Sequence, residues 1–492
     1  MMQILKLDGN TVEIIACPPE DVRKGDYLLL KEEEANAALV VQVVNVGYAN
    51  VPGLLEDLLR ETSTRSLPGI DVDLFGIRSF VDTIKDAKVY HCKLRRAVAH
   101  GRLSDDISWT PNRSSTVVRK LANEEVLKLI GATSGKMSFN LGKLKGGTDI
   151  CLPIRALDGR LNIVTGKKGT GKSHLSKLLL LSLVEQGATC IVFDVNGEYV
   201  GLSDLNEERT QVNAIHVLVP GRNFKTTLRY TGLNVFLNIV TTALELPPNS
   251  AWEIRRIWST LAESNALNLK KLGEAINTVT NGYVKDALHR RYESLLISGL
   301  FTDNLEEATT LEDWVDRCKD GGGLVVNLRG LSAPIRQIVV EFMLSKLRHL
   351  LENWHLQALF LFAEEAHLYL RDTYWDDLVT RMRHLGIFTT FITNQPDSIN
   401  EGIYRQADNI FLFNFTNEND LNAVSKATAA DVETVTTIAR ELPPRHCLAI
   451  GKIVNDFPVI LSVRSIQART MGETRFFFTK QEEEKPQEAL AI

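Results

Sequence analysis

The chain has 492 residues, of which 44% are hydrophobic and 24% are charged, and its formal net charge is −5. This length exceeds what one ordinary hydrophobic core organises, so we expect two or three domains. The near-neutral charge excludes a surface that is basic throughout, although a local basic channel remains compatible with it.

The sequence also lacks membrane-spanning or secretory segments and paired cysteines, and both observations restrict the class of protein it can encode. The sequence has no uncharged apolar run of about 18 residues or more and no secretory signal character at its start, so we expect no membrane contact and a cytoplasmic location. Its six cysteines are widely scattered and form no C-x-x-C pair. We therefore expect free thiols and no zinc site.

The N-terminal part of the chain predicts β-strands. Short alternating or β-branched runs are separated by Pro and Gly turns, and these runs are Gln3–Leu7, Thr11–Ile15, Asp26–Leu30, Ala38–Tyr48 and Val89–Val98. Several short strands of this kind predict a small β-barrel. Within the same part, Gly53–Thr64 predicts a helix and Ser104–Asn112 a loop.

From Leu161 onward, strands alternate with helices, which is typical of an α/β fold with a mainly parallel sheet covered on both faces. The predicted strands are Leu161–Thr165, Cys190–Asp194, Gly323–Leu328, Leu359–Ala363, Phe388–Thr393 and Asn409–Phe415. The region Asn234–Asp320 is helical throughout and too long for one crossover, so we interpret it as a helical insertion. The charged segment Gln481–Pro486 predicts disorder.

These patterns predict four parts. Residues 1–150 form an N-terminal barrel domain with a linker, and residues 151–233 together with 321–470 form the α/β core. Residues 234–320 form the helical insertion, and residues 471–492 form a C-terminal tail or brace.

The segment from Gly166 to Ser173 matches the phosphate-binding pattern G-x-x-x-x-G-K-[ST]. An apolar strand precedes it, and an amphipathic helix, Ser173–Gln186, follows. Glycines let successive backbone N–H groups point inward, and the helix N-terminus favours an anion. The predicted nucleotide-binding residues are Gly166, Lys168, Gly169, Thr170, Gly171, Lys172, Ser173 and His174.

The chemistry of this pattern assigns individual roles. Lys172 would neutralise the β- and γ-phosphates of ATP, and the Ser173 hydroxyl would hold Mg²⁺. The alternative, a chance loop, does not account for the flanking strand and helix.

A second element ends in two carboxylates. The apolar run Ala358–Ala363 predicts a buried parallel strand, and Glu364 and Glu365 follow it at the end where ligands bind. We expect Glu364 on the metal side and Glu365 as the base that polarises water. Asp is usual at the position of Glu364, which favours water-mediated contact with the metal. The alternative is a solvated carboxylate pair that caps a helix.

Two further turns follow predicted strands. Asp194–Tyr199 places two carboxylates, Asp194 and Glu198, toward the same crevice, the alternative being an ordinary strand-to-loop turn. The amide of Gln395, in Thr393–Pro396, would detect the γ-phosphate and report its loss. Taken alone, Gln395 is also compatible with a plain surface position.

With these elements in order, the chain resembles the HerA family of hexameric ATPases, within the larger group that includes FtsK-type DNA translocases. The resemblance covers most of the length. It depends on Gly166–Ser173, Asp194–Tyr199, Asn327–Leu331, Glu364–His367, Gln395 and the final segment from Leu442 to Ile460, which resembles the closing strands of the family. It departs from the family at Val195, where Pro is common, and at Asn327, where an acidic residue is frequent.

The resemblance implies a RecA-like P-loop motor domain, preceded by a small barrel like that of the family. It further implies a homohexamer with ATP at the subunit interfaces, double-stranded DNA in the central pore and arginine fingers supplied in trans. The candidates are Arg160 and either Arg381 or Arg383, and we favour Arg160 and Arg383, although a plain surface charge accounts equally well for a single arginine.

Two functional hypotheses share these motifs. The first is an ATP-driven DNA translocase or helicase that works with a separate nuclease or sirtuin-like effector, in DNA end processing or antiviral defence, since the chain has no nuclease constellation of its own. The second is an ATP-dependent ring that assembles an effector and moves little DNA. An ABC-type ATPase is disfavoured because no LSGGQ-like signature precedes the second carboxylate motif. The basic spots Asn223–Lys225 and Lys270–Lys271 suggest solvated faces more than DNA contacts.

Overall fold

The computed structural model describes residues 2–32, 37–49, 86–99, 102–204, 214–370, 377, 380–425 and 430–466. The helix expected at Gly53–Thr64 and the tail expected at residues 471–492 lie outside these ranges. The chain divides into two compact units. The first comprises Met1–Ser176, Trp375–Val379 and Thr390–Ser465, and the second comprises Lys177–Tyr374, Thr380–Thr389 and Ile466–Ile492.

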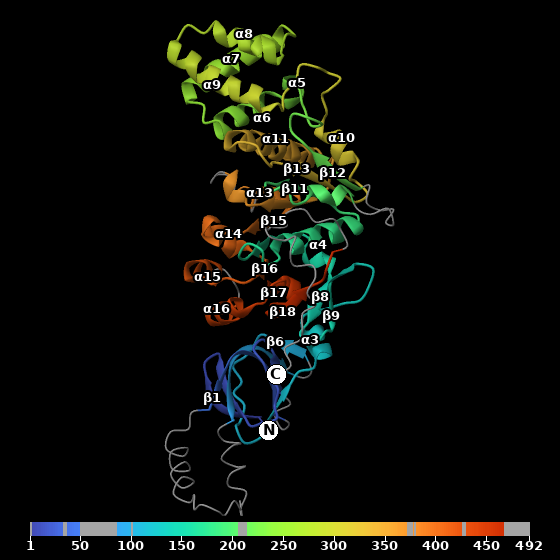
Figure 1. Ribbon diagram of the computed structural model, residues 1–492, viewed down its shortest axis with the longest axis vertical. Helices are drawn as coiled ribbons and strands as arrows, with labels where there is room; N and C mark the ends of the chain where they lie inside the picture. Colours follow the sequence, from blue (N-terminus) through green and yellow to red (C-terminus); the bar gives the residue numbers. More distant parts are fainter. Residues whose placement is uncertain are drawn as a thin grey trace, which may run out of the picture. The chain divides into compact units, whose positions relative to one another are not determined.

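The N-terminal part of the first unit is a curled antiparallel sheet (Figure 1). Its strands follow the order β1-β2-β5-β4-β3-β7, with β6 paired to β5, and β1 lies close to β7. Their bounds are β1 Met2–Asp8, β2 Thr11–Ala16, β3 Tyr27–Glu32, β4 Ala37–Tyr48, β5 Lys88–Ala99, β6 Arg102–Ser104 and β7 Thr116–Lys120. All five strands expected here are present, and the sheet is barrel-like.

Alternation along these strands determines which side of the sheet becomes the core. In β2, Val12 and Ile14 are fully buried, whereas the residues between them are only partly buried. Because successive strand side chains point to opposite faces, one apolar set from every strand meets inside the curl. This interior includes Leu28, Leu39 and Tyr90.

The rest of the first unit contains a mixed sheet. β10 Asn162–Thr165 lies between β15 Ile387–Thr393 and β16 Asn409–Leu412, and both pairings are parallel. Antiparallel strands then extend the sheet in the order β17, β18, β8 and β9. Their bounds are β17 His446–Gly451, β18 Val459–Val463, β8 Ser138–Leu144 and β9 Asp149–Pro153.

The second unit contains four parallel strands in the order β12-β13-β11-β14. Their bounds are β12 Ile215–Leu218, β13 Gly322–Asn327, β11 Thr189–Asp194 and β14 Leu359–Glu364. Every residue of β11 and β14 is buried, as expected for parallel strands covered on both faces. The long helix α11 Ala333–Glu352 belongs to this unit.

Helices connect or flank these strands. In the first unit they are α3 Asn123–Leu129, α14 Glu401–Gln406, α15 Glu418–Ser425 and α16 Val432–Glu441. The helix α4 Lys172–Glu185 begins in the first unit and continues into the second. The short α13 Arg381–Leu385 belongs to the second unit.

The region predicted as a helical insertion, residues 234–320, is rich in helices and belongs to the second unit, where α7, α8 and α9 pack on one another (Figure 1). The helices in and directly before this region are α5 Leu228–Thr231, α6 Leu233–Asn238, α7 Pro248–Glu263, α8 Leu269–Asn277, α9 Gly282–Ser298 and α10 Leu311–Asp316. Local sequence sets their starts, because Asn268, Asn281 and Thr310 each accept a backbone N–H as N-caps.

The expectation of a mainly parallel sheet is confirmed only in part. The central strands are parallel, but β17, β18, β8 and β9 add an antiparallel extension. Strand β8 and the first two residues of β9 come from the region that the sequence assigned to the N-terminal domain and its linker. Short hairpin strands carry no signal of which sheet they will join, so only the tertiary fold places them. Within the described ranges, no helix combines the length and apolar character needed to span a bilayer.

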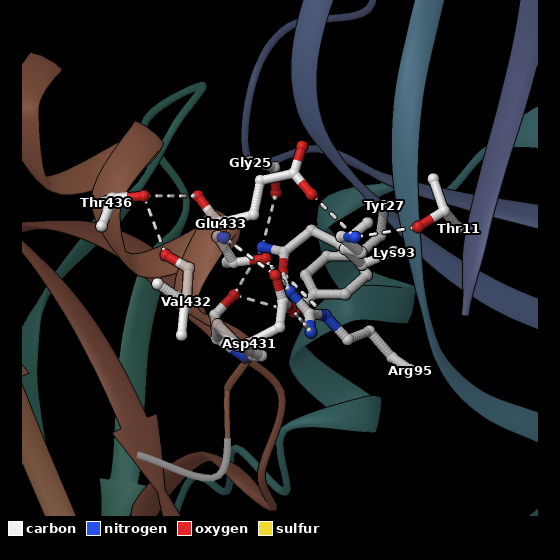
Figure 2. A network of polar contacts seen from close by, with 12 residues as sticks. Thr11, Gly25, Tyr27, Lys93, Arg95, Asp431, Val432, Glu433 and Thr436 are labelled. Carbon is white, nitrogen blue, oxygen red and sulfur yellow. Dashed lines mark hydrogen bonds and ion pairs between the residues drawn. The ribbon is translucent and has the colours of Figure 1, made fainter. Parts of the chain in front are cut away.

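A partly buried polar network joins the barrel-like sheet to α16 within the first unit. Figure 2 shows Lys93 and Arg95 of β5 pointing toward Asp431 and Glu433. The Arg95 guanidinium donates to Asp431 Oδ2 at 2.8 Å, to Thr434 Oγ1 at 2.7 Å and to Gln42 Oε1 at 2.9 Å. Asp431 also caps α16 by accepting the Thr434 N–H at 2.9 Å.

This network places a charge pair where little water reaches it, since the Arg95 side chain is only 9% exposed. Burial acts to raise the pKa of Asp431, but hydrogen bonds from Thr434 and the charge of Arg95 outweigh it and lower the pKa. Lys93 adds an ion pair to Glu433 at 2.7 Å. The junction therefore fixes the start of α16 against the barrel-like sheet.

We expect Arg95→Ala to lower the free energy of unfolding by about 2–3 kcal/mol, because Asp431 loses a buried charged partner. Because folding lowers the pKa of Asp431, its ionised carboxylate stabilises the folded protein at pH values above the usual pKa range of Asp. This stabilisation is lost as the pH falls through the folded-state pKa, so the difference in unfolding free energy between Arg95→Ala and wild type should shrink in acid. Denaturant unfolding at two pH values measures this. Arg23→Ala, which removes only the exposed pair with Asp21, is the control and should leave stability unchanged. Equal effects of the two substitutions would contradict this account of the junction.

Candidate active site

The predicted phosphate loop lies in the first unit, between the end of β10 at Thr165 and the start of α4 at Lys172. The loop turns by means of glycines in left-handed conformations, with φ of +80° at Gly169 and +121° at Gly171. Side chains other than glycine rarely adopt these angles. The glycine spacing read from the sequence is therefore a backbone requirement of this turn.

At two positions of the loop, the close packing of neighbouring residues also requires glycine. A Cβ on Gly166 would lie 2.4 Å from the Cβ of Phe413. A Cβ on Gly171 would lie 3.0 Å from Phe413 Cε1 and 3.3 Å from the Cα of Arg445. Phe413 is fully buried just beyond β16, so the loop closes onto a rigid apolar wall.

The loop presents donors suited to an anion. Within the part of the chain that the structure describes, the backbone N–H groups of Lys168, Gly169 and Gly171 have no protein acceptor. Lys172 is buried, and its Nζ donates to the Lys167 carbonyl oxygen at 2.9 Å. The ammonium group is thus held against the loop that is expected to bind the phosphates of ATP. Donors arranged in this way fit a polyphosphate.

The other predicted residues of this segment have distinct surroundings. Thr170 is tied to its own loop, since its Oγ1 donates to the Lys167 carbonyl oxygen at 2.7 Å. Ser173 is partly exposed in the first turn of α4. His174 is bonded away from the loop, because its Nε2 lies 2.7 Å from the Arg464 carbonyl oxygen.

Strand register brings Gln395 to the same edge of the sheet as the loop. Thr165 pairs with Thr393, and the Thr165 hydroxyl donates to the Thr393 carbonyl oxygen at 3.2 Å. Both chains leave the sheet directly after this pair. The Gln395 backbone N–H donates to Thr393 Oγ1 at 3.0 Å, while its side chain is exposed. Its position is compatible with the predicted sensing role.

The predicted arginines lie in different settings. Arg160 precedes β10, at the opposite end of that strand from the phosphate loop, and pairs with Asp408 at 3.0 Å while remaining 40% exposed on its side chain. Asp408 also accepts the Leu161 N–H at 2.9 Å, so the pair secures the start of the strand. Arg383 lies in α13 of the second unit and is partly buried. A role in trans remains a prediction for both.

The predicted carboxylates are brought together in the second unit. Phe193 pairs with Ala363 in the parallel ladder of β11 and β14, so Asp194 and Glu364 follow at the same edge. Asp194 is fully buried and accepts three backbone N–H groups: Gly197 at 2.7 Å, Glu198 at 3.0 Å and Tyr199 at 2.9 Å. These bonds explain the tight turn expected after this strand.

Glu364 is 2% exposed, and its carboxyl group is hydrogen-bonded to Asp194. Burial, together with the negative charges of Asp194 and Glu198, raises the pKa of Glu364 well above its usual range. Among the described residues, Glu364 Oε2 is a buried oxygen without a hydrogen-bond partner. A buried acceptor of this kind is costly unless a cation or donor binds to it.

Glu365 adopts a left-handed backbone conformation with φ of +45°, which is unusual for a residue with a side chain. It is 8% exposed, and the His367 Nδ1 lies 3.7 Å from its Oε2. Strained backbone of this type tends to occur at functional sites. The geometry is compatible with the predicted base.

The described residues contain no group of three or more acidic, His or Cys side chains that could hold a metal alone. Mg²⁺ needs only one or two protein ligands because it retains waters and binds substrate phosphates. In the first unit, Ser173 offers a hydroxyl at the start of α4. In the second unit, Glu364 offers a carboxylate oxygen without a hydrogen-bond partner among the described residues. Each side chain by itself has the donor chemistry predicted for it, and their joint role as metal ligands stays a prediction.

Several residues that shape the site were missed from the sequence. Phe413, Asn414 and Arg445 contact the phosphate loop, yet they lie more than 200 positions downstream in the chain. In the second unit, Arg329 crosses the turn after β11, because a Cβ on Gly197 would lie 2.6 Å from its Cδ. No local pattern identifies such contacts, since only the strand order creates them.

Comparison with known proteins supports the resemblance stated from the sequence. Residues 139–347 match the family described as the central domain of helicase HerA. Through this segment the chain is similar to the HerA family. The DNA double-strand break repair helicase HerA of Sulfurisphaera tokodaii is 23% identical, and the match covers 94% of this chain and 93% of the relative. The expected resemblance and the expected enzyme class, an ATPase, are confirmed.

Solved structures support the fold assigned to this chain. VirB4 of Thermoanaerobacter pseudethanolicus is similar with a TM-score of 0.52 at 13% identity, covering 68% of this chain and 98% of that one. The plasmid coupling protein TrwB in complex with ADP and Mg²⁺ is similar with a TM-score of 0.50 at 13% identity, covering 71% and 94%. At such identities the likeness concerns the fold alone.

We expect Glu364→Gln to stabilise the protein, measured without nucleotide or Mg²⁺, more at pH 8 than at pH 5. A raised folded-state pKa means that folding favours the protonated form, so wild-type stability is lost as the pH rises above the usual Glu range toward the folded-state value. Glutamine is neutral at both pH values and avoids this loss. Thermal unfolding of both proteins at the two pH values tests this. A difference in melting temperature that does not grow with pH would contradict the raised pKa.

Proposed function

We propose that this chain is one subunit of a homohexameric ring that uses ATP to move double-stranded DNA through its central pore. In this proposal the ring is a translocase or helicase that works with a separate nuclease or sirtuin-like effector. The observation that carries the proposal is the glycine loop Gly166–Gly171 leading into the buried Lys172, in a chain whose central domain matches HerA.

The residues of the loop would bind ATP as follows. The backbone N–H groups of Lys168, Gly169 and Gly171 would donate to phosphate oxygens, and the Lys172 ammonium would neutralise charge on the β- and γ-phosphates. Ser173 and Glu364 would hold Mg²⁺, which, when bound, withdraws charge from the phosphates. The fold relative TrwB was solved with ADP and Mg²⁺, which supports this choice of ligands.

Hydrolysis would use the carboxylates and the neighbouring subunit. Glu365 would accept a proton from the attacking water, and Gln395 would contact the γ-phosphate and detect its departure. The accumulating negative charge would be met by Arg160 and Arg383 acting in trans. The partial exposure of the Arg160 side chain leaves it accessible to a neighbour.

The DNA part of the proposal rests on the relatives. Three similar proteins are named DNA double-strand break repair helicase HerA. A chain with a net charge of −5 can still grip DNA, because a ring repeats each Lys or Arg contact six times in the pore. A ring that only assembles an effector shares every motif, so the response to DNA separates the two.

We expect duplex DNA to raise the ATPase rate of the wild-type protein about tenfold or more, because translocation couples turnover to the bound strand. The measurement is steady-state phosphate release with and without a linear duplex. Lys172→Ala is the matched control and should lose turnover in both conditions, since the γ-phosphate loses its counter-charge. Wild-type hydrolysis that ignores DNA, together with tight effector binding, would instead favour the assembly ring. Turnover retained by Lys172→Ala would refute the phosphate-site assignment.

A second prediction separates binding from chemistry. Glu365→Gln should bind ATP with near wild-type affinity while its rate of hydrolysis falls by about 100-fold or more, because an amide cannot accept the proton of water. Equilibrium binding and single-turnover hydrolysis measure the two effects. Loss of nucleotide binding in this variant would show that Glu365 is not the base.

A further inference from the structure

A second loop of the first unit lies against the phosphate loop. It connects the end of α16 to the start of β17 and comprises Leu442–His446, which we call the PPR loop. The backbone N–H of Arg445 donates to the Thr170 carbonyl oxygen at 2.8 Å. The Arg445 Cα would also meet a Cβ on Gly171 at 3.3 Å. Arg445 therefore lies directly beside the last turn of the phosphate loop before α4.

Asn414 joins the two loops at another point. Its carbonyl oxygen accepts the Lys167 N–H at 3.0 Å, and its side-chain Nδ2 donates to the carbonyl oxygens of Arg440 at 3.0 Å and Leu442 at 3.1 Å. On the far side, the Val463 N–H donates to the Arg445 carbonyl oxygen at 2.9 Å. The PPR loop is thus anchored to the phosphate loop and to β18, so Arg445 has a fixed position.

The backbone of Arg445 is strained, with φ of +60°. Few residues with a Cβ adopt this conformation, and arginine is not among those that tolerate it best. Glycine would satisfy the same turn at lower cost. A functional role for the side chain would explain why a long cationic residue occupies a position that favours glycine.

The Arg445 side chain is exposed, and within the described ranges it has no acidic partner. Its neighbours in the same unit differ, since Arg440 pairs with Glu418 at 2.9 Å and Arg160 pairs with Asp408 at 3.0 Å. Because the Arg445 backbone lies against the phosphate loop, its cationic side chain adds positive charge near the place where an anion is expected to bind. Guanidinium groups also suit phosphate oxygens geometrically, because their donors form a planar fork.

The contact with Thr170 and Gly171 indicates which phosphates are within reach. In loops of this type the backbone N–H groups cradle the α- and β-phosphates, whereas the lysine reaches the β- and γ-phosphates. We propose that Arg445 is a nucleotide-binding residue that contacts the α/β-phosphate side of ATP from its own subunit. This assignment rests on the proposed ATP binding and adds a contact that ATP and ADP share.

The test uses Arg445→Gly in the full chain, because glycine keeps the left-handed backbone and removes only the guanidinium. We expect the Kd values for Mg²⁺–ADP and Mg²⁺–ATPγS to rise together by about tenfold or more, as for loss of a charge-assisted hydrogen bond. The kcat at saturating ATP should stay within about threefold of wild type, because the γ-phosphate contacts are unchanged. Isothermal titration calorimetry and steady-state hydrolysis measure these quantities.

Arg440→Ala is the matched control, since it removes a nearby arginine whose side chain is occupied by Glu418. It should leave both Kd values unchanged. Arg445→Asn, which also tolerates the left-handed backbone, should reproduce the effect of Arg445→Gly without its added backbone freedom.

Unchanged Kd values in Arg445→Gly would overturn the inference, and so would weakening confined to ATPγS, which would indicate a γ-phosphate contact. If the wild-type protein bound neither nucleotide, the proposed function itself would fail, and this inference with it. Wild-type binding combined with an unaffected Arg445→Gly variant would refute the role of Arg445 alone.

Discussion

The parallel pairing of β10 with β15 and β16 is the constraint on which the phosphate site depends. It makes Thr165, Thr393 and Leu412 end at one edge of the sheet, so the segments that follow them must share the same small space. Gly166 then faces Phe413, and no side chain fits between them. The glycine pattern is therefore a response to packing as well as to the phosphates. A loop held between rigid neighbours keeps its N–H groups pointed inward without help from a ligand.

In the second unit, the same principle concentrates negative charge. The ladder between β11 and β14 places Asp194 and Glu364 at neighbouring strand ends, and both are buried. Burying two carboxylates together is unfavourable, and three backbone N–H groups that donate to Asp194 offset part of this cost. Burial and the neighbouring negative charges also raise the pKa of Glu364, which favours its protonated form.

The junction between the barrel-like sheet and α16 links two parts of the first unit that differ in sequence character. Arg95 reaches the N-cap of α16, and the residues after that helix form the PPR loop that contacts Thr170. The barrel-like sheet therefore contacts the start of α16, and the segment that follows the end of this helix contacts the phosphate loop.

The sequence by itself determined the elements whose signal is local. It predicted the P-loop from glycine spacing between a strand and a helix, the buried strand ending in Glu364 and Glu365, the five barrel strands and the helical insertion. It also carried enough of the motif order to show the resemblance to the HerA family. Tertiary structure alone decided the antiparallel extension by β8 and β9, the ion pair of Arg160 with Asp408, and the position of Arg445 beside Gly171. The physical reason is that these three features depend on strand order and on contacts between residues far apart in the chain. Local periodicity and spacing contain no information about either.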